Sequence, residues 1–176
     1  MEWNIVLAIG TREIAVSSML GALSFMCEVI PGAPFDIPFP PYSRVTWDLT
    51  GIPIMISLLL YGPLCAVYTC LVGCSIIFLR GNVSGGFFKV VAELATLLAY
   101  VVVRKGLITK TVVAATSRVA VMTVTNFFML PFFYKIPEVV VIGLLPVLAL
   151  FNSTQAVINI LPAYTIHDRL RSLVQR

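Results

Sequence analysis

The sequence predicts an all-α integral membrane protein, a compact bundle of six transmembrane helices in a single domain covering residues 1–176. Hydrophobic residues make up 59% of the chain and charged residues only 11%, whereas soluble domains carry about 25% charged residues. The mean hydropathy is +0.99. Long uncharged stretches alternate with short segments that hold charges, prolines or glycines. Such a chain is suited to lipid, because it has too few polar side chains to cover a surface in water.

The first helix is expected at about residues 14–30, after Arg12 and Glu13. Residues 31–41 then contain five prolines in eleven residues. A helix cannot continue through such a segment, because proline lacks the backbone N–H and clashes with the preceding turn. We therefore expect a loop in extended or turn conformation, and it is long for a membrane bundle.

The next uncharged run covers residues 49–79, which is too long for one span. Tyr61-Gly62-Pro63 interrupts it. The run therefore predicts two helices, at about 49–61 and 64–79, joined by a tight turn. The glycine-rich segment 80–86 predicts a loop.

Three further helices are expected in the second half of the chain, at about residues 87–103, 111–134 and 139–166. Arg104-Lys105-Gly106 ends the first of them, and Lys135-Ile-Pro-Glu138 follows the second. The last apolar stretch is expected to be interrupted at Pro146 and again at Pro162.

Six spans place both termini on the same side of the membrane, and the basic residues predict which side. Seven lie on the side of the termini: Arg12, Arg104, Lys105, Lys110, Arg169, Arg171 and Arg176. Four lie on the opposite side: Arg44, Arg80, Lys89 and Lys135. Cytoplasmic loops carry the excess of Lys and Arg, which predicts a plasma membrane protein with cytoplasmic termini. Segments 31–44 and 80–86 are then external, either as a lid over a pocket or as simple connectors.

Composition and motifs argue against several functional classes. The basic residues are scattered between apolar runs and do not form the basic patch of a nucleic-acid-binding protein. The four cysteines lie in apolar segments without a Cys-x-x-Cys pair, so we expect packing roles and no metal site. No P-loop, His-Glu-x-x-His motif or close pair of carboxylates is present. The sequence therefore predicts no enzyme, no catalytic residue and no cofactor.

Polar residues inside the predicted spans are the candidates for a ligand site. Asn126 lies in the fifth helix, and Asn152, Gln155 and Asn159 lie in the sixth. Polar groups at membrane depth normally face the protein interior or a cavity. A rise of 1.5 Å per residue puts Gln155 and Asn126 at a similar depth, roughly 12–14 Å below the outer surface. They are placed to hold the polar edge of a planar ligand, although hydrogen bonds between helices are the alternative.

Lys89 and Glu93 lie four residues apart on the fourth helix and can pair with each other. We expect this pairing to be structural, with ligand binding by Glu93 as the alternative. Arg118 lies within the fifth span and is left out of the charge count.

Several segments, taken in order, resemble the substrate-binding S-components of energy-coupling factor (ECF) transporters, and most closely their riboflavin-specific branch. They are Ser18-Met-Leu-Gly-Ala22, Phe39-Pro-Pro-Tyr42, Asp48-Leu-Thr-Gly-Ile-Pro53, Tyr61-Gly62-Pro63, Ala92-Glu93-Leu94-Ala95, Asn126 and Phe151-Asn152. The chain departs from the family pattern at two positions. Gly51 replaces an acidic residue, and Gln155 replaces a lysine of the riboflavin branch.

The resemblance implies a subunit that captures riboflavin or a related vitamin from outside, and it implies the residues that do so. The substrate-binding residues would be Asn126, Gln155, Asn152, Phe39, Tyr42 and Glu93. Transport would depend on a transmembrane coupling subunit and two ABC ATPases. Ser18, Gly21 and Ala22 would dock on the coupling subunit, or alternatively pack inside the bundle. Other functions left open are an S-component for another small metabolite, a small membrane enzyme and a scaffold subunit.

Overall fold

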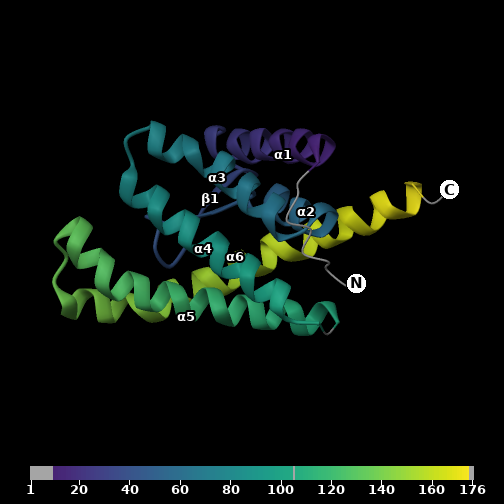
Figure 1. The fold of residues 1–176 in the computed structure, drawn as a ribbon. Helices are drawn as coiled ribbons and strands as arrows, with labels where there is room; N and C mark the ends of the chain where they lie inside the picture. The colour runs from purple at the N-terminus through teal and green to yellow at the C-terminus, as the bar shows by residue number, and fades with distance from the viewer. Residues whose placement is uncertain (1–9, 105, 175–176) are drawn as a thin grey trace.

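The computed structural model describes residues 10–104 and 106–174, with side chains described up to residue 170. This part of the chain forms six helices and one two-stranded hairpin (Figure 1). The elements are α1 (Thr11–Val29), β1 (Asp36–Pro38), β2 (Thr46–Asp48), α2 (Gly51–Tyr61), α3 (Pro63–Leu79), α4 (Val83–Val102), α5 (Leu107–Tyr134) and α6 (Glu138–Val174). The prediction of an all-helical bundle with six helices is confirmed.

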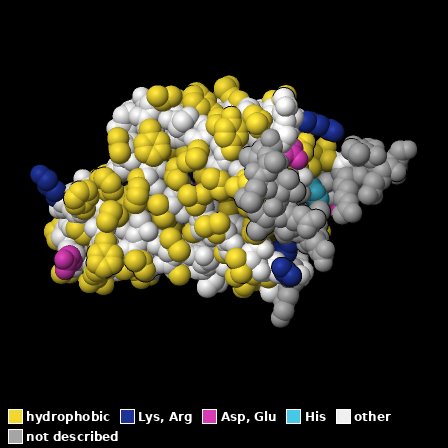
Figure 2. Space-filling model, in the orientation of Figure 1, with side chains coloured by type: hydrophobic (Ala, Val, Ile, Leu, Met, Phe, Trp, Pro, Cys, Tyr) yellow, Lys and Arg dark blue, Asp and Glu magenta, His cyan; other side chains and the backbone are white. Residues whose placement is uncertain are grey.

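Three of the described helices are long and apolar enough to cross a membrane: α4, α5 and residues Glu138–Leu170 of α6. The helices α2 and α3 are apolar but shorter. Figure 2 shows one face of the molecule, on which hydrophobic side chains cover the middle and charged side chains gather at the two ends. Of the basic residues in the predicted charge asymmetry, Lys105 and Arg176 lie outside the described residues.

The sequence-based boundaries were wrong for two helices. Residues 83–86 were expected in a loop but form the first turn of α4, because the Asn82 side chain accepts a hydrogen bond from the Gly85 N–H at 2.9 Å and caps the helix. Helix α6 runs without a break past Pro146 and Pro162. Prolines are tolerated inside membrane helices where neighbouring groups compensate for the lost backbone bond.

The proline-rich segment contains the first strand of a hairpin, and the second strand follows it. Strand β1 pairs antiparallel with β2, with Ile37 opposite Trp47. The indole Nε1 of Trp47 donates to Thr154 Oγ1 on α6 at 2.9 Å, which ties the hairpin to the last helix. The expectation of extended conformation in this segment is confirmed.

The turn between α2 and α3 shows why Tyr61-Gly62-Pro63 ends one helix and starts another. Gly62 has φ = 91°, a conformation that side chains other than glycine rarely adopt, and its N–H donates to Leu58 O at 3.0 Å. Pro63 is the first residue of α3, where its missing N–H costs no helical hydrogen bond.

The helix α1 packs closely on α3 through small residues. A Cβ added to Gly21 would lie 2.8 Å from Val72 Cγ1, and one added to Gly73 would lie 2.3 Å from Ser24 Oγ. Contacts then run from α2 to α6 and from α3 to α4, with α5 packed on α4 and α6. The beginning of α1 and the end of α6 lie at the same end of the bundle (Figure 1).

Candidate ligand-binding site

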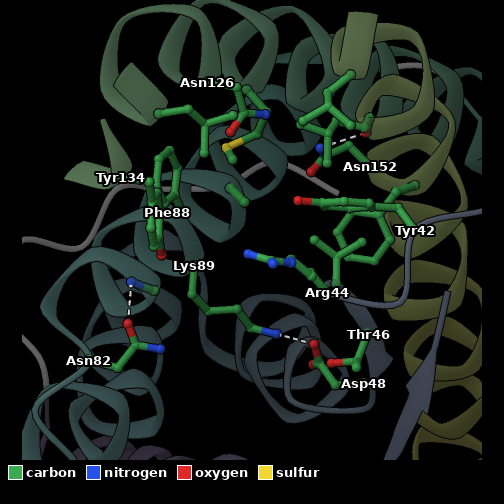
Figure 3. A pocket seen from close by; sticks show the side chains of 18 of the residues that line it. Tyr42, Arg44, Thr46, Asp48, Asn82, Phe88, Lys89, Asn126, Tyr134 and Asn152 are labelled. Atoms are coloured by element: carbon green, nitrogen blue, oxygen red, sulfur yellow. Dashed lines mark hydrogen bonds and ion pairs between the residues drawn. The ribbon is translucent and has the colours of Figure 1, made fainter. Parts of the chain in front are cut away.

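The residues between β1 and β2, 39–45, form the hairpin loop. A cavity of about 550 Å³ lies between this loop and helices α4, α5 and α6. This volume is within the range of sites that hold small organic molecules. Its polar lining residues are Glu28, Tyr42, Arg44, Thr46, Asp48, Asn82, Lys89, Arg118, Asn126, Tyr134 and Asn152. Figure 3 shows Tyr42 and Arg44 reaching from the loop into a space that has Asn126 and Asn152 on one side and Lys89 on the other.

One stripe of α5 forms a wall of this cavity. Arg118, Met122, Asn126, Leu130 and Tyr134 all line it, and residues four apart share a helix face. Tyr134 follows Arg118 by sixteen positions, which is roughly 24 Å at 1.5 Å per residue. Tyr134 is close to the α4 start, with its hydroxyl 2.8 Å from Ser84 Oγ. Arg118 is therefore at the deep end and Tyr134 at the end nearest the α4 start.

Asn126, in the middle of this stripe, presents a side-chain amide to the cavity. Only 5% of the residue is exposed, and its amide makes no hydrogen bond to the described residues. Since no fully buried side-chain nitrogen or oxygen of the described residues lacks a partner, the Asn126 amide must be accessible from the cavity. A buried amide without a protein partner is a ready hydrogen-bonding group for a ligand.

Arg118 and Asn152 form the deep end of the cavity. Arg118 Nε donates to Asn152 Oδ1 at 3.2 Å, and Arg118 Nη1 donates to Glu93 Oε1 at 3.0 Å. The Arg118 side chain is 2% exposed, and its charge is balanced by that of Glu93. This pair corrects the expectation that Glu93 would pair with Lys89 on its own helix.

Lys89 instead forms an ion pair with Asp48 of β2, at the edge of the cavity (Figure 3). Asp48 Oδ1 also accepts from Thr50 N at 2.9 Å. Burial acts to raise the pKa of Asp48, but the Lys89 ammonium and the hydrogen bonds outweigh it and hold the pKa below its usual value of 3.8. Asp48 is therefore a carboxylate at neutral pH, and it fixes the Lys89 side chain.

Comparison with known proteins identifies the family of this fold and site. Residues 12–167 match the family described as the substrate-specific component of ECF transporters. The chain belongs to this family. It is therefore called an S-component below.

A curated relative and a solved structure agree with this assignment. The S-component is 25% identical to the riboflavin transporter RibU of Staphylococcus aureus (strain TCH60), over 94% of this chain and 93% of that protein. The structure titled "Structure and mechanism of the S component of a bacterial ECF transporter" matches with a TM-score of 0.79 at 23% identity, covering 94% of this chain and 98% of that one. The fold is thus that of an S-component, and transporter membership together with the apolar helices supports a membrane location.

The cavity brings together three of the six substrate-binding residues predicted from sequence: Tyr42, Asn126 and Asn152. The other three do not line it. Phe39 is 2% exposed and packs against the rings of Trp47 and Phe151. Glu93 is 1% exposed and is bonded to Arg118 and Asn159.

Gln155 lies behind the hairpin and outside the cavity lining. Its Nε2 donates to Asp48 O at 2.8 Å and to Asn159 Oδ1 at 2.9 Å, and its Oε1 accepts from Asp48 N at 3.3 Å. These bonds occupy the amide of Gln155 within the protein.

The residues predicted for docking do not share one surface. Gly21 is buried against α3, whereas Ala22 is exposed. The Ser18 hydroxyl donates to Ile14 O at 2.8 Å and lies 3.0 Å from Tyr68 Oη. Gly21 therefore packs inside the bundle, which was the alternative to docking. A docking role stays a prediction for Ala22 and its exposed neighbours.

Eight of the eleven polar cavity residues are missing from the sequence-based set, among them Arg118 and Asp48. An arginine within an apolar span is a strong signal of a buried functional or structural site, so Arg118 could have been included on that ground. Asp48 pairs with Lys89 across 41 residues of sequence, and no local spacing rule predicts such a pair.

Proposed function

We propose that this S-component captures riboflavin in the cavity between the hairpin loop and α4–α6. The observation that carries the proposal is the buried Asn126 amide, which has no hydrogen-bond partner among the described residues and is accessible from a cavity of about 550 Å³. The likeness to RibU of S. aureus supports riboflavin as the substrate. Riboflavin combines a planar three-ring system carrying carbonyl and N–H groups with a polyhydroxyl chain, and the cavity offers both apolar walls and dispersed polar groups.

The aromatic and polar lining residues fit the two parts of such a molecule. Tyr42, Phe88 and Phe151 line the cavity with flat apolar surface that can pack on a ring system. Asn126 and Asn152 supply amides from facing helices. The deep end is lined by Arg118 and Asn152, while Arg44, Asn82 and Tyr134 are further polar lining residues that can bind hydroxyl groups.

In this proposal the S-component spans the plasma membrane several times, with both termini in the cytoplasm and the hairpin loop outside. The support is the asymmetry of Lys and Arg in the sequence and the position of the two described chain ends at the same end of the bundle (Figure 1). Single cysteines at Thr109, near the start of α5, and at Glu138, the first residue of α6, would test the orientation in a background without the four native cysteines. An impermeant thiol reagent should label the Glu138→Cys variant but not the Thr109→Cys variant in intact cells.

The S-component would provide substrate specificity, and the energy would come from a transmembrane coupling subunit with two ABC ATPases. Family membership supports such partners. The exposed side of α1, with Ala15, Met19, Ala22 and Met26, offers small and flexible apolar side chains on which another helix can pack.

The substrate is tested by identifying what the purified chain carries. The chain would be purified in detergent from riboflavin-replete cells and heat-released, and the released molecule would be analysed by absorbance and mass spectrometry. We expect riboflavin in a ratio near one per chain. Release of a different vitamin would overturn riboflavin as the substrate while keeping the S-component assignment.

A further inference from the structure

Arg118 has hydrogen-bonding capacity that the described residues do not use. Its Nε–H is taken by Asn152 Oδ1 at 3.2 Å, and Nη1 donates to Glu93 Oε1 at 3.0 Å and to Thr96 Oγ1 at 3.2 Å. Nη2 makes no hydrogen bond to the described residues. Since Arg118 lines the cavity and no fully buried side-chain nitrogen of the described residues is unpaired, Nη2, which carries two N–H groups, is accessible from the cavity.

The orientation of the neighbouring Asn152 amide is fixed by chemistry. Arg118 Nε can only donate, so the Asn152 atom facing it must be the oxygen. The Leu148 carbonyl can only accept, so the atom 2.8 Å from it must be Nδ2 of Asn152. The second N–H of Nδ2 makes no hydrogen bond to the described residues, and Asn152 lines the cavity. The deep end of the cavity is therefore rich in donors.

The positive charge at this end is already balanced. Glu93 pairs with Arg118, and both Glu93 carboxylate oxygens also accept from Asn159 Nδ2 at 3.1 Å. A ligand group at Nη2 consequently needs lone pairs, but it does not need a negative charge. A neutral carbonyl oxygen meets this requirement, and an amino group in the same place would set donor against donor.

We propose that Arg118 is a specificity-determining residue that selects ligands carrying a carbonyl acceptor at the deep end of the cavity. Nη2 of Arg118 binds that oxygen, with the remaining N–H of Asn152 beside it. This inference rests on the proposed riboflavin function, since it assigns the dicarbonyl edge of the flavin ring to this end. The polyhydroxyl chain then extends along α5 toward Asn126 and Tyr134.

The distance between these groups is compatible with one bound molecule. Asn126 is eight residues from Arg118 on the same face of α5, roughly 12 Å along the helix. A planar three-ring molecule held by its carbonyl edge at Arg118 therefore reaches the level of Asn126. The same ligand can use both groups without any change in the backbone.

The first test leaves the protein unchanged and varies the ligand. Riboflavin and its two analogues with sulfur in place of one ring carbonyl oxygen would be titrated into the purified chain, because thiocarbonyl sulfur is a weaker acceptor. At least one analogue should bind about five- to a hundred-fold more weakly, the range for losing one buried hydrogen bond. Equal affinity for all three ligands would overturn the proposal. Failure of riboflavin itself to bind would overturn the proposed substrate and this inference together.

The second test changes the protein. In Arg118→Lys, and in the charge-neutral pair Arg118→Gln with Glu93→Gln, the preference for oxygen over sulfur should fall toward one-fold. Val121, on the same helix, is 38% exposed. The variant Val121→Ala is the matched control and should keep the full preference. A folded Arg118 variant that keeps the full preference would overturn the role of Arg118 while leaving riboflavin binding established. If neither variant folds, the ligand series on the unchanged protein decides the proposal.

Discussion

Gln155 holds the backbone of Asp48 with both ends of its side-chain amide. Nε2 donates to the Asp48 carbonyl at 2.8 Å and Oε1 accepts from the Asp48 N–H at 3.3 Å. Gln155 is fully buried. The contact fixes β2 on α6 and so places the Asp48 carboxylate where it can pair with Lys89 at the cavity edge. Gln155 thus shapes the binding site from behind.

Replacing Gln155 by leucine should destabilise the protein. The change leaves the backbone N–H and carbonyl of Asp48 without their partner, and an unsatisfied buried group costs about 1–3 kcal/mol. The free energy of unfolding, from a denaturant titration in detergent, should fall by that amount. Ser153→Ala, two residues away and bonded only to the Leu150 carbonyl, should change it little. An unchanged free energy for Gln155→Leu would show that the contact does not hold the hairpin.

Asn126→Ala should weaken ligand binding without weakening the fold. Its amide has no hydrogen bond to the described residues to lose, but the bound ligand would lose one, which corresponds to roughly five- to a hundred-fold in the dissociation constant. Val124→Ala, 58% exposed on the other side of α5, is the control and should bind normally. Asn126→Ala with unchanged affinity would remove this residue from the site.

The pH dependence of stability should report the Asp48–Lys89 pair. The pKa of Asp48 is below 3.8 in the folded protein, so its stabilising contribution is present above the carboxyl pKa of the unfolded chain. That contribution is lost as the pH falls through the folded pKa. The difference in unfolding free energy between the natural chain and Asp48→Asn should therefore be constant from pH 8 to about pH 5 and shrink only below about pH 4. A difference that already declines near pH 6 would contradict this assignment.

Two tryptophan substitutions should separate internal packing from partner docking on α1. Gly21→Trp should prevent folding, because even a Cβ at this position would lie 2.8 Å from Val72 Cγ1. Ala22→Trp adds bulk to an exposed position, so the isolated chain should fold and bind its ligand. It should lose the coupling subunit in co-purification and should not support transport. Normal transport by Ala22→Trp would exclude this part of α1 from the docking surface.

The helices were predictable because apolar runs and punctuating residues are local signals. Tyr61-Gly62-Pro63 marked the α2–α3 turn, which the φ of Gly62 explains. The start of α4 was missed because Gly85 and Gly86 favour a loop in isolation, whereas the Asn82 cap makes them helical. The continuity of α6 through two prolines depends on its surroundings in the bundle. A local rule for proline takes no account of these surroundings.

The site was predictable only in part, because its pairings are long-range. Polar residues in apolar helices pointed correctly to Asn126 and Asn152 as cavity residues. The rule for residues four apart favoured a Lys89–Glu93 pair, but Asp48 and Arg118 compete for these side chains and form the pairs instead. The depth argument placed Gln155 beside Asn126, but Gln155 meets the hairpin, whose position the sequence does not reveal.

Titrating riboflavin into the purified ligand-free chain shows whether this S-component binds riboflavin in the cavity, as proposed. Binding is followed by the quenching of flavin fluorescence, with Asn126→Ala and Val124→Ala measured in parallel. We predict saturable binding with one riboflavin per chain, weakened by Asn126→Ala and unaffected by Val124→Ala. A folded chain that shows no saturable quenching, or that binds riboflavin equally well with alanine at position 126, would contradict the account.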